Sequence, residues 1–133
     1  MVDDLTDPRR TEPPKVLAER AMLEQWLEFH RTTLLLKVEG LDGDHAARRP
    51  VPTSKLSLHG LVRHMGEVER NWFARTLLRR REIPYIWADD AINDRELELG
   101  GADLAADIAT WQEECARGRA AARRCRCAGS TCT

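Results

Sequence analysis

Three side chains in this sequence have the types and positions that metal or acid–base chemistry requires: His30, His64 and Glu69. Imidazole and carboxylate groups bind divalent metals and carry protons, and a polar group on the apolar side of a helix needs a partner. His30 falls within an apolar stripe between Trp26 and Leu34, and His64 falls at the edge of another. For each histidine, a metal ligand and a core histidine satisfied by a hydrogen bond remain open alternatives.

Glu69 is placed near the centre of an apolar helical face when positions are counted at about 100° per residue. A carboxylate avoids such surroundings unless it is paired. It could be a metal ligand, the partner of a ligating histidine, or a general base. The alternative is a buried ion pair with an arginine from another helix.

The remaining histidines and cysteines are weaker candidates. His59 projects toward the flank of its helix together with Arg63, and His45 falls in a loop, so both are expected to be solvated. Three cysteines crowd the end of the chain without the two-residue gap typical of zinc sites. These are Cys125, Cys127 and Cys132.

Three amphipathic helices must position these groups. Apolar spacing predicts one helix over about residues 16–41, after an extended, proline-rich arm at 1–15. A second helix is expected from Ser57, its N-cap, to about residue 81, and a third begins after Asp103. With no alternating strand pattern, the prediction is an all-α, antiparallel, up-down bundle, which usually has four members. All four tryptophans are expected in its core: Trp26, Trp72, Trp87 and Trp111.

The segment 116–133 has a different composition from the rest. It holds five arginines, no acidic residue and no large apolar residue, so it is expected to contribute nothing to a core. The fourth helix of the bundle is therefore predicted to be missing or altered. Either another chain completes the fold, or the sequence is truncated or frame-shifted near residue 116. The expected organisation is an arm at 1–15, an incomplete bundle at 16–120 and an atypical tail at 121–133.

Composition limits the function classes. The 133 residues are 42% hydrophobic and 32% charged with a formal charge of −1, which favours one soluble domain and disfavours nucleic-acid or anionic-membrane partners. The acidic start is followed by no apolar stretch, so a cytoplasmic location is expected. The chain also has no glycine-rich phosphate loop, no nucleophile elbow and no His-Glu-x-x-His motif.

Four sequence segments together resemble a known family. They are LEFHRTTLLLKVEGL at 27–41, RPVP at 49–52, SLHGLVRHMGEVERNWF at 57–73 and WQEEC at 111–115. This combination resembles the DinB-like superfamily, and within it an actinobacterial branch of uncharacterised "mini-circle protein" domains. The resemblance covers about residues 16–120 and extends to the metal-binding domains of mycothiol-dependent maleylpyruvate isomerases.

The resemblance implies a four-helix bundle related to isomerases and transferases that use mycothiol or bacillithiol. In such proteins three histidines hold a divalent metal such as zinc, nickel or iron, one from the second helix and two from the fourth. His64 matches the second-helix ligand, but no histidine follows it in this sequence. The expected function is thus ancestral metal binding, with a low-molecular-weight thiol as partner and two ligands lacking. The alternative is a non-enzymatic helical module that forms a homodimer through an exposed groove.

Overall fold

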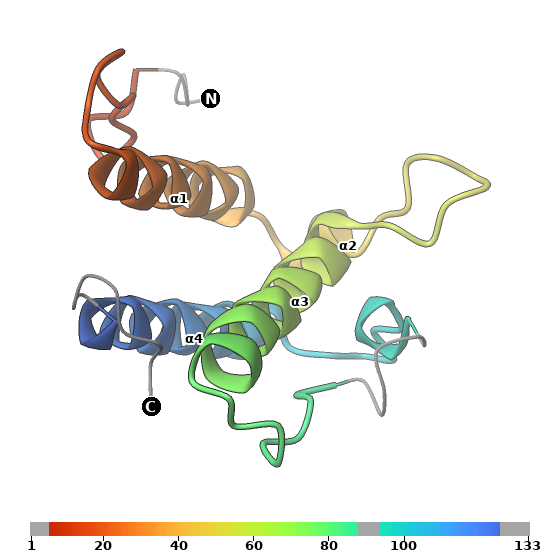
Figure 1. Ribbon diagram of the computed structural model, residues 1–133. Helices are drawn as coiled ribbons and strands as arrows, with labels where there is room; N and C mark the ends of the chain where they lie inside the picture. Colours follow the sequence, from red (N-terminus) through yellow and green to blue (C-terminus); the bar gives the residue numbers. More distant parts are fainter. Residues whose placement is uncertain (1–5, 88–93, 126–133) are drawn as a thin grey trace. The chain divides into compact units, whose positions relative to one another are not determined.

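A computed structural model describes residues 6–87 and 94–125 of the chain, and the regular secondary structure within these ranges is helical (Figure 1). The predicted all-α class is confirmed, and the described residues contain no strand. The chain forms two compact units, Met1–Leu41 and Asp42–Thr133. The elements in chain order are α1 (Glu19–Val38), α2 (Gly43–Ala46), α3 (Leu58–Glu69), η1 (Arg70–Leu77), η2 (Arg95–Leu97) and α4 (Leu104–Arg124).

The first unit consists of α1 and the segment before it. That segment is held on its own helix, because Arg9 bridges Asp7 and Glu39 and the guanidinium of Arg10 donates to Thr33 Oγ1 over 2.9 Å. The two carboxylates keep the Arg9 pKa above its ordinary value. Within residues 6–15, the predicted arm is therefore non-helical but docked on α1.

Local capping signals set the starts of the helices in the second unit. Ser57 Oγ accepts the N–H of Gly60 over 2.9 Å and begins α3, and the Asp103 carboxylate accepts two backbone N–H groups and begins α4, both as predicted. Asp42 caps the short helix α2 by accepting the N–H of His45 over 2.8 Å. Side chains that cap backbone N–H groups need only local sequence.

The second half of the long helix widens into a π-helix, η1, and the helical segment ends at Leu77 rather than near residue 81. A π-helix turns through fewer degrees per residue than an α-helix. Phe73 rather than Trp72 therefore follows Glu69 onto the inner face. Trp72 is 60% exposed, so its predicted place in the core is wrong, whereas Trp111 on α4 is 2% exposed as expected.

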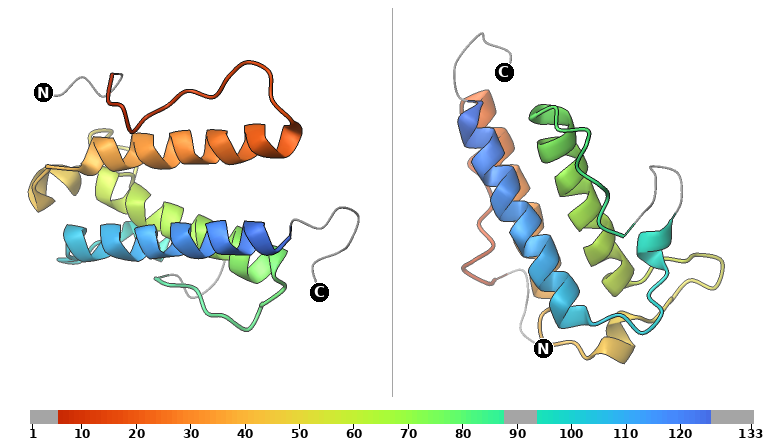
Figure 2. Two further views of the ribbon diagram at one scale, coloured as in Figure 1. Left: turned by 90° about the vertical axis from the view of Figure 1, so that its left-hand side faces the viewer. Right: turned by 90° about the horizontal axis from the view of Figure 1, so that it is seen from below.

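Helices α3 and α4 run in the same direction (Figure 2). His59, at the start of α3, contacts Asp107 at the start of α4, and Glu69, at the end of α3, contacts Cys115 further along α4. The alternation of directions expected for an up-down bundle does not apply to this pair. A parallel pair requires the connection, residues 78–103, to return the chain to the start of α3.

Side chains of α3 and η1 hold this connection in order. As the contacts move back along η1 and α3 toward the start of α3, their partners move forward along the connection. The contacts, in this order, are Arg75 with Ile83, Arg70 with Pro84, Glu67 with Trp87, His64 with Glu96 and Arg63 with Glu98. The described parts of the connection, residues 78–87 and 94–103, therefore follow α3 in the opposite direction, and α4 begins after them.

The arginine-rich segment continues α4 as far as Arg124. Gly118 and Ala121 are buried, so the expectation that nothing after residue 115 contributes to a core is wrong for this part of the chain. A Cβ added to Gly118 would lie 2.8 Å from Glu69 Oε2 and 2.9 Å from Phe73 Cδ2. Small residues thus bring α4 close to η1. Cys127 and Cys132 lie outside the described residues.

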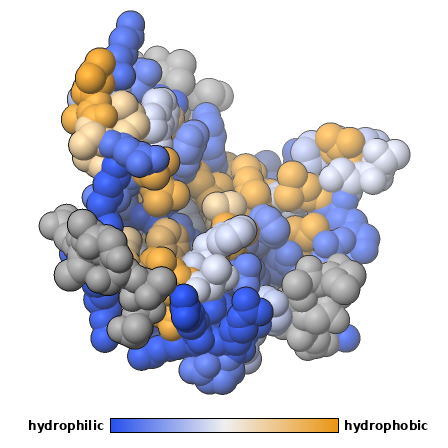
Figure 3. All heavy atoms as spheres, in the orientation of Figure 1, coloured by the Kyte–Doolittle hydropathy of each residue, from blue (hydrophilic) through white to orange (hydrophobic). Residues whose placement is uncertain are grey.

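The surface shown in Figure 3 carries many hydrophilic residues, with apolar residues in patches among them. Within residues 6–87 and 94–125, no helix combines the length and apolar character that a membrane crossing requires.

Candidate functional site

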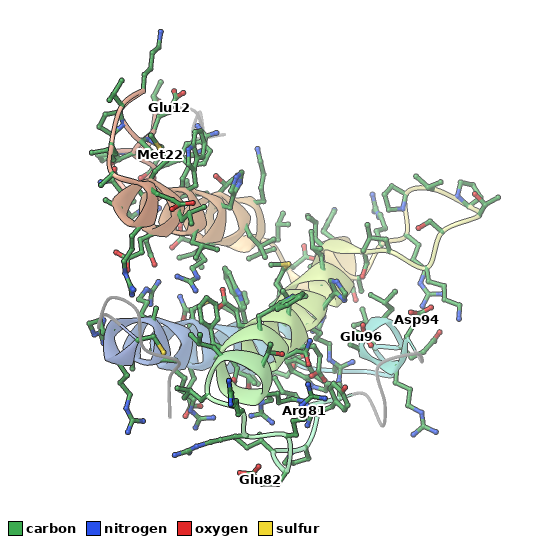
Figure 4. The ribbon with its side chains drawn as sticks, in the orientation of Figure 1. Glu12, Met22, Arg81, Glu82, Asp94 and Glu96 are labelled. Atoms are coloured by element: carbon green, nitrogen blue, oxygen red, sulfur yellow. The ribbon has the colours of Figure 1, made fainter. Side chains whose placement is uncertain are left out.

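His64 is the sequence-predicted residue with the most informative surroundings. Its side chain is 48% exposed, and its Nδ1 lies 3.0 Å from Oε1 of Glu96. Glu96 belongs to η2, the turn packed against α3, where Figure 4 labels it. Its side chain is buried. The contact uses one ring nitrogen of His64, Nδ1, and the second ring nitrogen, Nε2, takes no part in it.

Glu96 is held against α3 by contacts of the two residues that follow it. The guanidinium of Arg63 donates to the carbonyl of Glu98 over 3.1 Å, and Leu97 packs on Gly60, where an added Cβ would lie 3.2 Å from Leu97 Cδ2. Oε2 of Glu96 is buried and has no hydrogen-bond partner among the described residues. The sequence did not point to Glu96, because it shows only that the connection is acidic and rich in turn-forming residues, not which carboxylate is buried.

Glu69 is 4% exposed, which confirms its expected burial. Its Oε1 accepts a hydrogen bond from the thiol of Cys115 over 3.7 Å, across the α3–α4 contact. One residue further on, Arg70 pairs with Glu114 of α4 over 2.7 Å. The ion pair with an arginine that the sequence suggested for Glu69 itself remains a prediction. A catalytic or metal-binding role for Glu69 remains a prediction.

His30 lies in the first unit. Its ring stacks on Trp26 with centroids 5.8 Å apart and meets the edge of Phe29 at 5.4 Å. The residue is exposed on α1 rather than enclosed within that helix's apolar stripe. Its suggested role in a pocket or as the partner of a metal ligand remains a prediction.

His59 is 1% exposed, so the prediction that it is solvated is wrong. Its Nε2 lies 2.6 Å from Asp107 Oδ2, and the same oxygen is 3.2 Å from Nε of Arg63. The start of α4 covers this flank of α3 because the two helices are parallel. His45, by contrast, is exposed as predicted, and its Nδ1 lies 2.6 Å from Asp42 Oδ2.

The described residues do not form a protein-only metal site. Within residues 6–87 and 94–125, no group of three or more histidine, cysteine, aspartate or glutamate side chains is placed to hold a metal ion. His64 and Glu96 offer two groups, whereas catalytic zinc sites use three protein ligands. These residues therefore do not fit a tightly held resident metal.

Comparison with protein families gives one match that spans most of the chain. The family model described as mycothiol-S-transferase matches residues 22–130. The chain belongs to this family. The match to this mycothiol-S-transferase family, which is related to the DinB-like proteins, supports the predicted resemblance at that level and continues past residue 116 through the arginine-rich part of α4. No curated protein and no solved structure matches the chain.

Proposed function

We propose that this chain derives from a metal-dependent transferase or isomerase that acts on a low-molecular-weight thiol, and that it retains a weak divalent-cation site at His64. The observation that supports this is the position of His64 in the family motif, with Nδ1 held by Glu96 and the side chain half exposed. A divalent cation in such a site would act as a Lewis acid toward a bound thiol.

The proposal includes a limit on activity. No histidine follows His64 in the sequence, and the described residues provide one carboxylate beside it. A cation held by so few groups dissociates readily, so we expect the isolated chain to sustain little thiol transfer. Conjugation of mycothiol to an electrophile, followed with and without added Zn²⁺, measures this. A substantial Zn²⁺-dependent rate that survives His64→Ala would contradict the proposal.

Cation binding can be tested by calorimetric titration of the metal-free chain with Ni²⁺ or Zn²⁺. We expect weak binding that His64→Ala removes. His45→Ala is the matched control, because His45 is also exposed and its Nδ1 also lies against a carboxylate, that of Asp42. Equal binding by the wild-type chain and His64→Ala would remove His64 from the site.

A second candidate is a homodimer formed through apolar surface. Trp72 favours it, since a tryptophan that is 60% exposed on η1 is unusual for a group that normally packs. Sedimentation velocity over a range of concentrations should then show a monomer–dimer equilibrium that Trp72→Gln weakens. A monomer at every concentration would exclude this candidate.

A further inference from the structure

The ends of η1 and α4 bring exposed arginines together at one end of the second unit. Gly118 of α4 packs against Phe73 of η1, and the two helical segments continue in the same direction from that contact (Figure 2). From there the same number of residues leads to Arg79 and to Arg124. The exposed arginines at this end, which we call the arginine end, are Arg79, Arg80, Arg81, Arg123 and Arg124.

The positive charge of the arginine end is not compensated within the part of the chain that the structure describes. None of the five arginines forms an ion pair with a carboxylate of the described residues, whereas the nearby Arg70 and Arg117 both pair with Glu114. Glu82 follows Arg81 in the turn after η1 but forms no ion pair with it (Figure 4). Like charges gathered on one surface repel each other, and a bound anion would relieve this repulsion.

The turn that presents three of these arginines is held in place by Arg75. Its guanidinium donates to the carbonyl of Arg81 over 2.9 Å and also to the carbonyl of Ile83. Arg79 has a φ of 57°, in the left-handed region where the residue that follows a helix is usually glycine. An arginine in this conformation costs stability, and such costs are characteristic of functional positions. The side chain of Arg79 therefore has a use that its backbone does not explain.

The surroundings of the arginine end favour carboxylates over phosphates as ligands. Phosphate sites commonly use the backbone N–H groups of a helix N-terminus, whereas η1 and α4 both end here, and helix C-termini carry partial negative charge. Recognition is thus left to guanidinium groups, which pair well with planar carboxylates. The chain as a whole has a formal charge of −1, so an extended polyanion gains little attraction beyond this end. A short acidic segment is the ligand that fits.

We propose that the arginine end is a docking surface for an acidic segment of a partner protein, with several aspartate or glutamate residues close together in its sequence. The contacts lie on the surface, so the affinity is weak and falls as salt is added. The surface includes neither His64 nor a bound cation, and its test is therefore independent of the proposed function.

The test is the fluorescence anisotropy of a labelled hexaglutamate peptide titrated with the full-length chain at low salt. We expect saturable binding that is lost in about 0.5 M NaCl, where the Debye length is only about 4 Å. Arg80→Glu and Arg123→Glu, each made alone, should weaken binding about fivefold. Arg48→Glu is the matched control, because Arg48 is also exposed and without an ion pair to the described residues but lies in the segment before α3. No binding by the wild-type chain, or an equal loss in Arg48→Glu, overturns the proposal.

Competition distinguishes carboxylates from phosphates. Unlabelled hexaglutamate should displace the labelled peptide at a lower concentration of charge than inorganic tripolyphosphate or oligothymidylate does. If either phosphate compound displaces it more readily, the surface recognises phosphate, and the assignment to an acidic protein segment is wrong.

Arg79→Gly separates docking from folding. Glycine adopts a positive φ without strain, so this variant should have a higher urea midpoint than the wild-type chain and yet bind the peptide about twofold to threefold more weakly. An unchanged affinity would show that the strained arginine takes no part in docking and would refute the argument from its backbone.

Discussion

Replacing Gly118 by alanine would test how closely α4 packs against η1. The added Cβ would lie 2.9 Å from Phe73 Cδ2 and 2.8 Å from Glu69 Oε2. Atoms in contact prefer about 3.5 Å or more, so the Phe73 ring must move by about 0.6 Å and the Glu69 carboxylate by about 0.7 Å. The carboxylate is the end of a flexible chain, and the ring is the stiffer obstacle.

Two opposing effects determine how much Gly118→Ala changes the free energy of unfolding. Overpacking of this kind costs about 1–3 kcal/mol, and alanine in a helix interior recovers about 1 kcal/mol relative to glycine. We therefore expect Gly118→Ala to lower the free energy of unfolding by about 1 kcal/mol. In a Phe73→Ala background the obstacle is gone, and the same substitution should become stabilising by up to about 1 kcal/mol.

Urea unfolding followed by far-ultraviolet circular dichroism measures all four corners of this double-mutant cycle. Ala120→Gly, at an exposed position of the same helix, calibrates the propensity effect and should cost about 1 kcal/mol. If Gly118→Ala stabilises the chain equally in both backgrounds, α4 is not in close contact with η1 at this point, and the packing argument fails.

Three further predictions concern contacts at the starts of the helices. Asp107→Ala removes the carboxylate that the buried His59 contacts, and it should lower the free energy of unfolding by about 2–3 kcal/mol in the same assay. A loss under about 0.5 kcal/mol, which is typical of surface substitutions, would contradict this prediction. Ser57→Ala removes the N-cap of α3 and should cost about 1 kcal/mol, again by urea unfolding, and no measurable loss would argue against the cap. The backbone N–H and the ring of His45 hold the pKa of Asp42 below its ordinary 3.8. The cap of α2 therefore contributes its full stabilisation above pH 3.8, and this stabilisation is lost as the pH falls through the lower pKa of the folded state. Amide exchange at α2 should accelerate over that window beyond its intrinsic pH dependence, and Asp42→Asn should show no such step.

The sequence was informative wherever a structural feature depends on neighbouring residues. Ser57 and Asp103 were predicted as N-caps because a cap bonds N–H groups two or three positions away. The burial of Glu69 followed from helical periodicity for the same reason. The change to π-helical geometry after Glu69 has no such local signal, so the outward position of Trp72 was missed.

Features that depend on distant segments could not be read in this way. His59 was placed on a solvated flank because the parallel course of α4, which covers that flank, is determined by a long connection. Glu96 was missed because its contact with His64 spans 32 positions, and an acidic turn does not reveal which carboxylate points inward. The candidate site was therefore half predictable: its histidine by motif, and its carboxylate only from the structure.

The return of the connection along α3 has a consequence for the order of folding. Contacts along it close progressively wider spans, 8 positions for Arg75 and Ile83, 20 for Glu67 and Trp87, 32 for His64 and Glu96, and finally 48 for His59 and Asp107. Each doubling of the length of a closed loop costs about 0.6 kcal/mol of chain entropy. Once one contact has formed, the next contact closes a shorter loop and therefore costs less entropy. We expect the chain to fold as a zipper that begins beside η1 and docks α4 last, with φ-values larger at Glu67 than at Asp107; the reverse order of φ-values would refute this pathway.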